Sequence, residues 1–319
     1  MPSESQYAIS EYLDVDAVYA RLNKLVSQPL RKIKREKMAE YLEYFEKKCT
    51  RSHSLIQEAQ KIIPGGVQHN LAFNFPFPIA IEKADNAHLW DVDGNQYIDF
   101  LQAGGPTILG SNYAPVREKV IEMLQSCGPV TGLFHEYELK LAQLIQKHMP
   151  SIEMFRMLGS GTESVMAAIR AARTYTHKKN IIKVGGAYHG WSDSMVYGLH
   201  IPGTGRFEAK GIPAGASAHT QEFFPNDLGA LRRQLILNRL WGGTAAVIVE
   251  PVGPESGTRP VPFDFNQKVR ELCDEFGALL IFDEVVTGFR LGMGSAQGYF
   301  NVKPDLTVFG KCITGRYPM

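Results

Sequence analysis

The stretch "LLIFDEVVTGFR", residues Leu279–Arg290, decides the fold class, because four apolar residues run directly into two acids. An apolar run without alternation is typical of a strand that is buried on both faces. An ionised carboxylate at the end of such a strand is costly unless a cation or a hydrogen-bond donor meets it. The sequence therefore predicts a partner for one of the two acids, Asp283 or Glu284.

Apolar segments of this kind alternate with helical segments through the second half of the chain. Helices are expected where apolar residues recur at helical spacing, as in "ESVMAAIRAARTYT" and "NQKVRELCDEFG". The alternation predicts an α/β fold with a mainly parallel central sheet and helices on both faces. Ligands of such sheets bind beyond the carboxyl ends of the strands, so the chemistry is expected in the loops that follow them. The expected strands are 154–158, 180–186, 245–252, 278–286 and 305–310.

Changes in composition and residue pattern along the chain predict three regions. Residues 1–62 are highly charged and are expected to form a helical extension, either as a solvated surface or as an arm on a partner subunit. Residues 63–114 follow a "PGG" breaker and contain two expected short strands around the Asp93–Gly94 turn. Residues 115–319 are expected to form a large α/β domain.

The bulk composition is that of an ordinary globular protein, with 44% hydrophobic and 21% charged residues in a chain of 319. A formal net charge of +1 gives no electrostatic case for nucleic acid as a partner. Four widely spaced cysteines without a C-x-x-C pair predict neither a metal site nor a disulfide framework, and they favour a cytoplasmic location. The acidic N-terminus is unlike a signal peptide, and no apolar run reaches the roughly 18 residues of a membrane helix, so no membrane partner is expected.

A small Gly-rich turn, "GSGTES", precedes the helix that is expected in the middle of the chain. Gly159 and Gly161 permit unusual backbone angles, and the free amides at a helix start can bind a phosphate. A plain helix cap by Ser160 or Thr162 is the structural alternative. A dinucleotide fingerprint is rejected, because the third glycine is lacking and the next strand offers no acid for a ribose.

The loops after the other strands contain further candidates. In "GGAYHGW", Tyr188 and His189 can stack on a flat ring, although packing is the plainer explanation for an aromatic pair. Glu250 ends a strand and Glu255 follows in a Gly/Pro loop, where helix capping or a salt bridge is the alternative. Lys311 follows a short apolar strand and could simply point to solvent.

These candidates suggest one ligand when they are taken together. Lys311 lies 28 positions after Asp283, and both are expected near strand ends on one side of the sheet. A phosphate cradle, a stacking aromatic ring, a buried acid and a lysine suit a ligand that has a phosphate, a flat ring, a basic ring nitrogen and an aldehyde.

Five stretches carry a family resemblance: "GSGTESVMAAIRAAR", "AYHGW", "VEPVGPESG", "LLIFDEVVTGFR" and "PDLTVFGKCITG". In order and spacing they resemble the class III aminotransferases, pyridoxal-phosphate enzymes of fold type I. The nearest branch is that of glutamate-1-semialdehyde aminomutase and related amino-acid aminotransferases. The resemblance covers about residues 55–319, and its most specific part is the acid–lysine pair.

The resemblance implies a role for each member of that pair. Lys311 would form a Schiff base with the aldehyde of pyridoxal 5'-phosphate and then shuttle a proton between the substrate and the cofactor. Asp283 would pair with the pyridine nitrogen and keep it protonated, so that the ring acts as an electron sink. The expected partner of the strand-end acid is therefore a ring cation.

The remaining cofactor contacts are also implied by the resemblance. Val285 would pack on one face of the ring and Tyr188 on the other, with His189 beside them. Glu255 would lie near the phenolic oxygen or at the substrate gate, whereas Glu250 and Glu284 would be structural. Three residues of the Gly-rich turn would hold the phosphate: Ser160, Gly161 and Thr162.

The implied reaction is transamination, in which an amino acid or another amine donates its nitrogen and a keto acid or aldehyde accepts it. The small-molecule donor and acceptor are not named by the sequence, and a homodimer is implied as the working form. An aminomutase or an amino-acid racemase is the alternative within the same chemistry. A truncated, non-catalytic fragment or dimerisation partner is the alternative from a different class.

Three departures from the family pattern bear on these alternatives. The segment "PGGVQHNLAFNF" lacks the arginine that binds the substrate carboxylate in the aminomutase branch, which favours a transaminase with another amine donor or a racemase-like use of the same cofactor. The sequence ends a few residues past Lys311, so the C-terminal small domain of the family is expected to be missing. Arg316 stands where relatives usually have a glycine, and its long side chain is expected either to clash or to mimic a phosphate contact.

Overall fold

The structure is a computed structural model, and it describes residues 7–9, 11–127 and 132–315. The chain forms two compact units. The first, called the α/β unit below, contains the residues up to Arg21 together with those from Leu133 onward, and the second, called the intervening unit, contains Leu22–Gly132. These boundaries differ from the three regions expected from the sequence, because the N-terminal residues pack with the second half of the chain. That threefold division stays a prediction.

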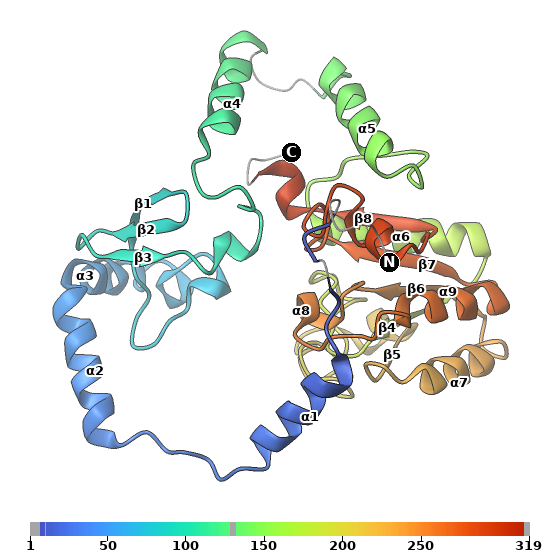
Figure 1. Ribbon diagram of the computed structural model, residues 1–319, viewed down its shortest axis with the longest axis horizontal. Helices are drawn as coiled ribbons and strands as arrows, with labels where there is room; N and C mark the ends of the chain where they lie inside the picture. Colours follow the sequence, from blue (N-terminus) through green and yellow to red (C-terminus); the bar gives the residue numbers. More distant parts are fainter. Residues whose placement is uncertain (1–6, 10, 128–131, 316–319) are drawn as a thin grey trace. The chain divides into compact units, whose positions relative to one another are not determined.

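The α/β unit is built on one five-stranded sheet in the order β5-β4-β6-β7-β8. All four neighbouring pairs are parallel, and Figure 1 shows the strands side by side with β8 at the top and β5 at the bottom. The expected mainly parallel α/β sheet is confirmed. The strands are β4 (Asn180–Val184), β5 (Thr220–Phe223), β6 (Thr244–Val249), β7 (Leu279–Glu284) and β8 (Leu306–Phe309).

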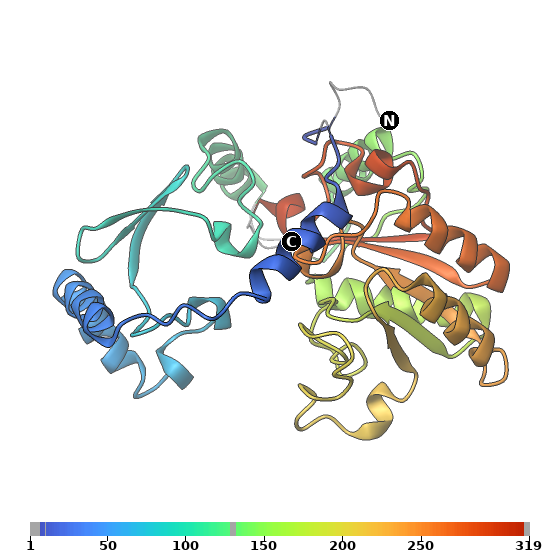
Figure 2. The ribbon, with the colours of Figure 1, turned by 60° about the horizontal axis from the view of Figure 1, so that its bottom comes forward.

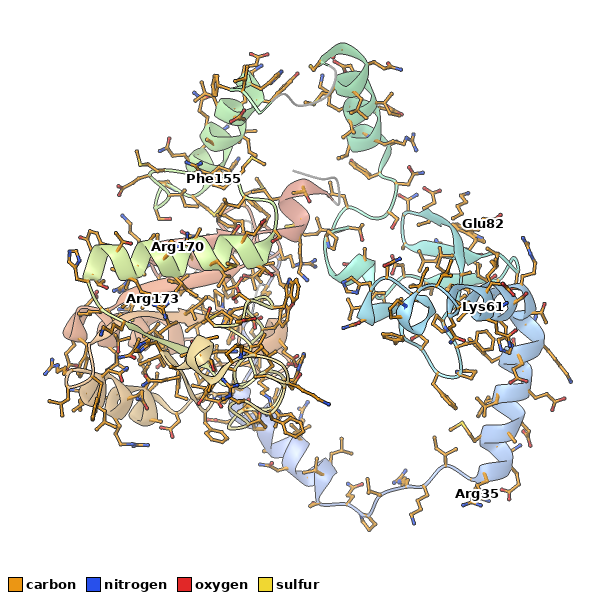
Figure 3. All side chains as sticks on the ribbon, turned by 180° about the vertical axis from the view of Figure 1, so that it is seen from behind. Arg35, Lys61, Glu82, Phe155, Arg170 and Arg173 are labelled. Carbon is orange, nitrogen blue, oxygen red and sulfur yellow. The ribbon has the colours of Figure 1, made fainter. Side chains whose placement is uncertain are left out.

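Helices cover both faces of this sheet, as its apolar strands require. Helix α6 (Gly161–Thr176) packs its buried face on β6, β7 and β8, and it lies in front of the sheet in Figure 3, where Arg170 and Arg173 are labelled. Helices α7 (Leu228–Asn238) and α9 (Phe265–Phe276) cover the opposite face (Figure 2). Alternate residues of β7 serve the two cores, since Ile281 faces α6 while Leu280 and Phe282 face α9.

The N-terminal segment completes the α/β unit through an aromatic cluster. The Tyr12 ring lies against Phe263 and Phe300, and its hydroxyl donates to the carbonyl of Val261 over 2.8 Å. Tyr7 adds an edge-on contact with Tyr299. The other elements of this unit are α5 (Glu136–His148), a 3-10 turn (Ala214–Ser217), α8 (Pro254–Gly257), α10 (Ser295–Phe300) and a 3-10 turn (Lys311–Thr314).

The intervening unit combines helices with a small antiparallel sheet in the order β1-β2-β3. The buried Asp91 accepts hydrogen bonds from Asn95 and from the hydroxyl of Tyr97, which fixes the turn at Asp93–Gly94. Its helices and strands are α2 (Arg35–Lys48), α3 (Thr50–Ala59), β1 (Ile81–Asp85), β2 (His88–Asp91), β3 (Gln96–Ile98) and α4 (Ala114–Cys127), and α1 (Val15–Val26) leads into it from the α/β unit.

Three details differ from expectation. The N-terminal region is helical, but the antiparallel element has three strands instead of two, because the chain also turns back at Asn86 between β1 and β2. Residues 154–158 form no strand, although their sequence is apolar enough for one. Strand β5 was not expected, because the sequence "TQEF" of this edge strand is largely polar.

Within the described part of the chain, no helix is both long and apolar enough to cross a membrane. No cluster of three or more His, Cys, Asp or Glu side chains is arranged to hold a metal ion within the same residues.

Candidate active site

The Gly-rich turn places the start of α6 beside the end of β7. Ser160 caps α6, since its hydroxyl accepts from the amide of Glu163 over 3.2 Å. The amides of Gly161 and Thr162 belong to the first helical turn, where a helix offers no acceptor of its own. A Cβ added at Gly161 would come within 3.1 Å of Val285, so the glycine is what allows this close approach. The turn therefore presents amide and hydroxyl groups next to the carboxyl end of β7.

Asp283 is bound by a buried histidine. The Nδ1 atom of His189 lies 2.7 Å from the Oδ2 atom of Asp283, and both side chains are shielded from solvent. The amide of Val285 donates to the other carboxylate oxygen over 3.0 Å. The Nε2 atom of His189 is buried and has no hydrogen-bond partner among the described residues. Asp283 is thus oriented from two sides, and each of its oxygens keeps acceptor capacity for a further donor.

Two buried charged groups, Glu250 and Lys183, bind the backbone of the loop that contains Tyr188. Glu250 accepts a hydrogen bond from the amide of Tyr188 over 3.0 Å. Lys183, fully buried in β4, donates to the carbonyls of Ala187 and Tyr197 over 2.7 and 2.8 Å, and burial lowers the pKa of its amine to about 8. The Tyr188 side chain is 48% exposed, so it keeps a surface on which a flat ring can stack.

The loop of Tyr188 and the Gly-rich turn touch each other at Gly190. A Cβ added there would come within 2.5 Å of the Thr162 hydroxyl and 2.8 Å of its Cα, and the φ angle of Gly190 is +85°. Glycine is therefore required at this position for both conformation and space. The contact brings Thr162 into the same group of loops as Tyr188.

Glu250 also fixes the next loop. Its carboxylate accepts from the amides of Glu255 and Ser256 over 3.0 and 2.7 Å. Both residues have a left-handed backbone, which is strained and persists only where neighbouring groups impose it. Burial raises the pKa of the Glu250 carboxyl. Because this carboxylate accepts hydrogen bonds from three backbone amides, Glu250 fixes the two loops to each other.

Lys311 follows β8 and opens the last 3-10 turn, with a left-handed φ of 49°. A Cβ on the preceding Gly310 would come within 3.0 Å of Val285, so Val285 is in close contact with both the Gly-rich turn and the Lys311 turn. Burial lowers the pKa of the Lys311 amine, and the nearby charge of Arg290 lowers it further. The charges of Asp283 and Glu250 act in the opposite direction, which places Lys311 within electrostatic reach of both.

Glu284, the second acid of the opening motif, points away from this group of residues. It is fully buried and accepts from the amide of Ala296 over 2.7 Å, from Gln297 and from the Thr287 hydroxyl. Burial raises the pKa of its carboxyl to about 7. These contacts anchor α10 to β7 and give Glu284 a structural setting.

The structure thus brings the sequence-predicted residues of four loops together at the carboxyl edge of the sheet. The backbone amide of Glu255 binds Glu250, whereas its side chain contacts His200. Sequence reasoning missed His200, Lys183 and the pairing of His189 with Asp283. His200 lies in a loop whose sequence has no periodicity. For His189, the aromatic setting of "AYHGW" indicated ring stacking rather than a hydrogen bond. Arg316 lies outside the described residues.

Comparison with known proteins gives these loops a context. The class-III aminotransferase family matches residues 72–319. Over 275 residues the chain is 45% identical to glutamate-1-semialdehyde 2,1-aminomutase 1 from Lachnoclostridium phytofermentans, covering 85% of this chain and 64% of that protein. The chain therefore spans less than two thirds of the length of the curated relative.

Solved structures agree with this relationship. An omega-transaminase from Sphaerobacter thermophilus is 31% identical, with a TM-score of 0.76 over 84% of this chain and 62% of that one. A transaminase with PLP bound is also 31% identical, with a TM-score of 0.74 over 85% and 63%. The family match extends over the whole five-stranded sheet and all of the loops described above, and the chain belongs to the class-III aminotransferase family.

Proposed function

We propose that this chain carries the cofactor site of an enzyme that transfers an amino group from an amino acid or another amine to a keto acid or aldehyde. Pyridoxal 5'-phosphate is the cofactor, and Lys311 is the residue to which it attaches covalently. The observation that carries the proposal is the convergence of the Gly-rich turn, Asp283, Tyr188 and Lys311 around Val285 and His189.

The residues of this site fit the cofactor. Gly161 and Gly310 leave room against Val285 that a Cβ would fill, and the buried Nε2 of His189 still lacks a partner among the described residues. Asp283 has acceptor capacity for a protonated ring nitrogen, and Tyr188 has an exposed surface. When bound, pyridoxal phosphate would take up the electron pair left by a proton that leaves the substrate α carbon.

Each side chain has a definite task in this proposal. Asp283 holds a proton on the ring nitrogen, and His189 orients the Asp283 carboxylate through its Nδ1 atom. Tyr188 and Val285 would cover the two faces of the bound ring and exclude water from it. The phosphate is bound by three residues of the turn, Ser160, Gly161 and Thr162.

Lys311 carries the proton transfer. Its amine must be uncharged to accept a proton from the substrate α carbon, and its lowered pKa increases the uncharged fraction near neutral pH. Burial and the charge of Arg290 supply this shift, whereas Asp283 limits it. The same lowered pKa favours covalent attachment of the cofactor aldehyde, because only the uncharged amine is nucleophilic.

The decisive experiment is trapping the attached cofactor. The purified chain is incubated with pyridoxal phosphate, reduced with borohydride, digested and analysed by mass spectrometry. We expect the added mass on the peptide that contains Lys311, together with a visible absorption band that is absent from Lys311→Ala. The matched control is Lys210→Ala, which removes an exposed lysine of the same unit. Equal labelling of Lys311→Ala and the wild type would reject the assignment.

An aminomutase reaction is a second candidate, supported by curated relatives that are 45% and 43% identical and bear that name. The segment "PGGVQHNLAFNF" (64–75), which lacks an arginine, supports the transaminase instead. The two are separated by substrate. An aminomutase converts glutamate-1-semialdehyde without a second amine, whereas a transaminase requires a donor and an acceptor.

We further propose a homodimer as the working form and a cytoplasmic location for the protein. Large apolar side chains near the site support a partner copy, since Trp191 and Phe207 are 76% and 78% exposed. The four cysteines described in the structure are free, as a reducing compartment would keep them.

A further inference from the structure

A histidine in the long loop after β4 joins two acids beside Tyr188. The Nδ1 atom of His200 lies 2.9 and 3.0 Å from the two carboxylate oxygens of Glu208. Its Nε2 atom lies 3.4 Å from a carboxylate oxygen of Glu255. The His200 ring also stacks on Tyr188, with ring centroids 6.5 Å apart and an interplanar angle of 26°. One imidazole thus contacts two side chains of its own loop and one from α8.

The two ring nitrogens of His200 face carboxylate oxygens, which accept hydrogen bonds but do not donate them when ionised. Nδ1 is within hydrogen-bond distance of Glu208, whereas Nε2 and Glu255 meet at the longer distance of an ion-pair contact. The imidazole is therefore the group that joins Glu208 to Glu255.

The contact with Glu255 supplements an anchor that is already present. Glu250 binds the backbone amides of Tyr188 and Glu255, whereas His200 contacts the side chains of the same two residues. Glu255 has a left-handed φ of 51°, and His200 itself has one of 53°. Strained residues of this kind are held by their surroundings, so the orientation of the Glu255 side chain depends on what it contacts.

The remainder of the loop is held independently of His200. Glu222 of β5 accepts from the amides of Gly203 and Gly205 over 2.9 and 2.8 Å. Among the described residues, the charged and titratable groups in contact with the ring are Glu208 and Tyr188, both from its own loop, and Glu255 from α8. A change at His200 should alter these side chains without releasing the loop.

We propose that His200 is a positioning residue of the cofactor site. It holds the Glu255 side chain through its Nε2 atom and lies against the outer face of Tyr188. The inference rests on the proposed function, because Tyr188 matters to catalysis only if it covers the cofactor ring. Cofactor binding should therefore weaken when the imidazole of His200 is replaced.

The first test needs no cofactor. Hydrogen exchange of the peptide around Glu255 is measured in the cofactor-free chain at about pH 6 for the wild type and His200→Asn. We expect about threefold faster exchange in the variant, the size typical of a solvent-exposed ion pair. His177→Asn is the matched control, since it is an exposed histidine with a φ of 56° and asparagine tolerates this backbone equally at both sites. Unchanged exchange in His200→Asn would refute the contact.

The second test measures the dissociation constant of pyridoxal phosphate. His200→Asn should bind the cofactor about threefold more weakly than the wild type, whereas His177→Asn should bind it as the wild type does. Glu208→Gln keeps the ring but removes the charge that orients it, so it should also weaken binding even if His200→Asn folds poorly. Equal dissociation constants in all four proteins would overturn the proposal.

The two proposals fail in different ways. If borohydride traps no cofactor on Lys311 but exchange near Glu255 still responds to His200, the proposed function is wrong and the His200 contact stands. If trapping succeeds and neither exchange nor cofactor affinity responds to His200, only the inference about His200 is wrong.

Discussion

Asp283 and Glu284 are adjacent on β7, and strand geometry sends their side chains to opposite faces of the sheet. Asp283 meets His189 and the amide of Val285 at the site, whereas Glu284 meets the first amides of α10. The alternation thus lets one short motif supply both a functional acid and a structural one. Their separate surroundings give separate experimental signatures.

Removing the charge of Arg290 should make Lys311 harder to deprotonate. Arg290 contributes to the lowered pKa of the Lys311 amine, so Arg290→Met should move that pKa upward. The amine reacts with an acylating reagent only when it is uncharged, and its labelling curve should therefore shift to higher pH. Mass spectrometry of the Lys311 peptide after brief acetylation at several pH values measures the curve.

The control for this shift is Arg232→Met, which removes an arginine of α7 that pairs with Glu275. It should leave the pH dependence of Lys311 acetylation unchanged. The same unchanged pH dependence in Arg290→Met would contradict the assigned role of Arg290.

Glu284 should make folding stability depend on pH. Its pKa rises from an ordinary 4.5 to about 7 in the folded chain, so the folded state retains a proton that the unfolded state has lost between these values. Stability should fall as the pH rises from about 4.5 to about 7, by about 3 kcal/mol at most, because one unit of pKa is worth about 1.4 kcal/mol.

Glu284→Gln cannot ionise and should lack this contribution. Its lost acceptor should cost about 1–3 kcal/mol at acid pH, and the gap to the wild type should narrow as the pH rises. Urea unfolding of both proteins at about pH 5 and about pH 8 measures the gap. A stability difference of equal size at both pH values would show that Glu284 ionises normally in the folded state.

At the scale of elements, the close approach of two loops at Gly190 should be sensitive to one methyl group. Gly190→Ala would place a Cβ against Thr162 in a backbone that disfavours alanine, and it should cost about 2–4 kcal/mol. Gly211 has the same φ of +85° with no atom near its added Cβ, so Gly211→Ala isolates the backbone cost.

Cofactor affinity is the second measurement on this pair. Gly190→Ala displaces Thr162 and Tyr188 and should weaken the binding of pyridoxal phosphate, whereas Gly211→Ala should bind it as the wild type does. Equal losses of stability in the two variants would mean that the contact with Thr162 gives way without cost.

Elements with a strong apolar pattern were predictable from the sequence, and those without one were not. β4, β6 and β7 are buried on both faces, so their composition is dominated by Val, Ile, Leu and Ala. β5 lies at the edge of the sheet and reads as "TQEF", which carries no such pattern. Lys183 can be fully buried in β4 because two carbonyls accept hydrogen bonds from its amine, a tertiary contact that no local pattern encodes.

The candidate site was also predictable only in part. Strand ends could be located, so the residues after them were predictable as a group. Their partners were not, because His189 meets Asp283 across 94 positions and His200 meets Glu255 across loops of irregular backbone. Hydrogen bonds of this range depend on the final packing of the α/β unit.

At the scale of the whole molecule, every proposed site residue lies between Ser160 and Lys311 in the α/β unit. The connection between α1 and α2 is exposed and contains Arg31, Lys32 and Lys34. Trypsin at low concentration should cut there first, and the cut chain should still attach pyridoxal phosphate to Lys311. Mass spectrometry locates the cut, and borohydride trapping measures attachment.

Gel filtration extends this experiment to the N-terminal segment. The released N-terminal fragment should remain bound to the α/β unit, because Tyr12 is held by Val261, Phe263 and Phe300. Loss of cofactor attachment after a single cut in the connection would show that the site depends on the N-terminal segment being joined covalently to the rest of the chain.

Synthesis on the ribosome separates the Tyr12 ring from its partners in time. The hydroxyl of Tyr12 meets the carbonyl of Val261 across 249 positions. At about 5–20 residues per second, roughly 12 to 50 seconds pass between the synthesis of Tyr12 and that of Val261. During this interval an aromatic segment at the front of the nascent chain has no native surface to cover it, so the first part of the α/β unit to emerge is among the last to find its place.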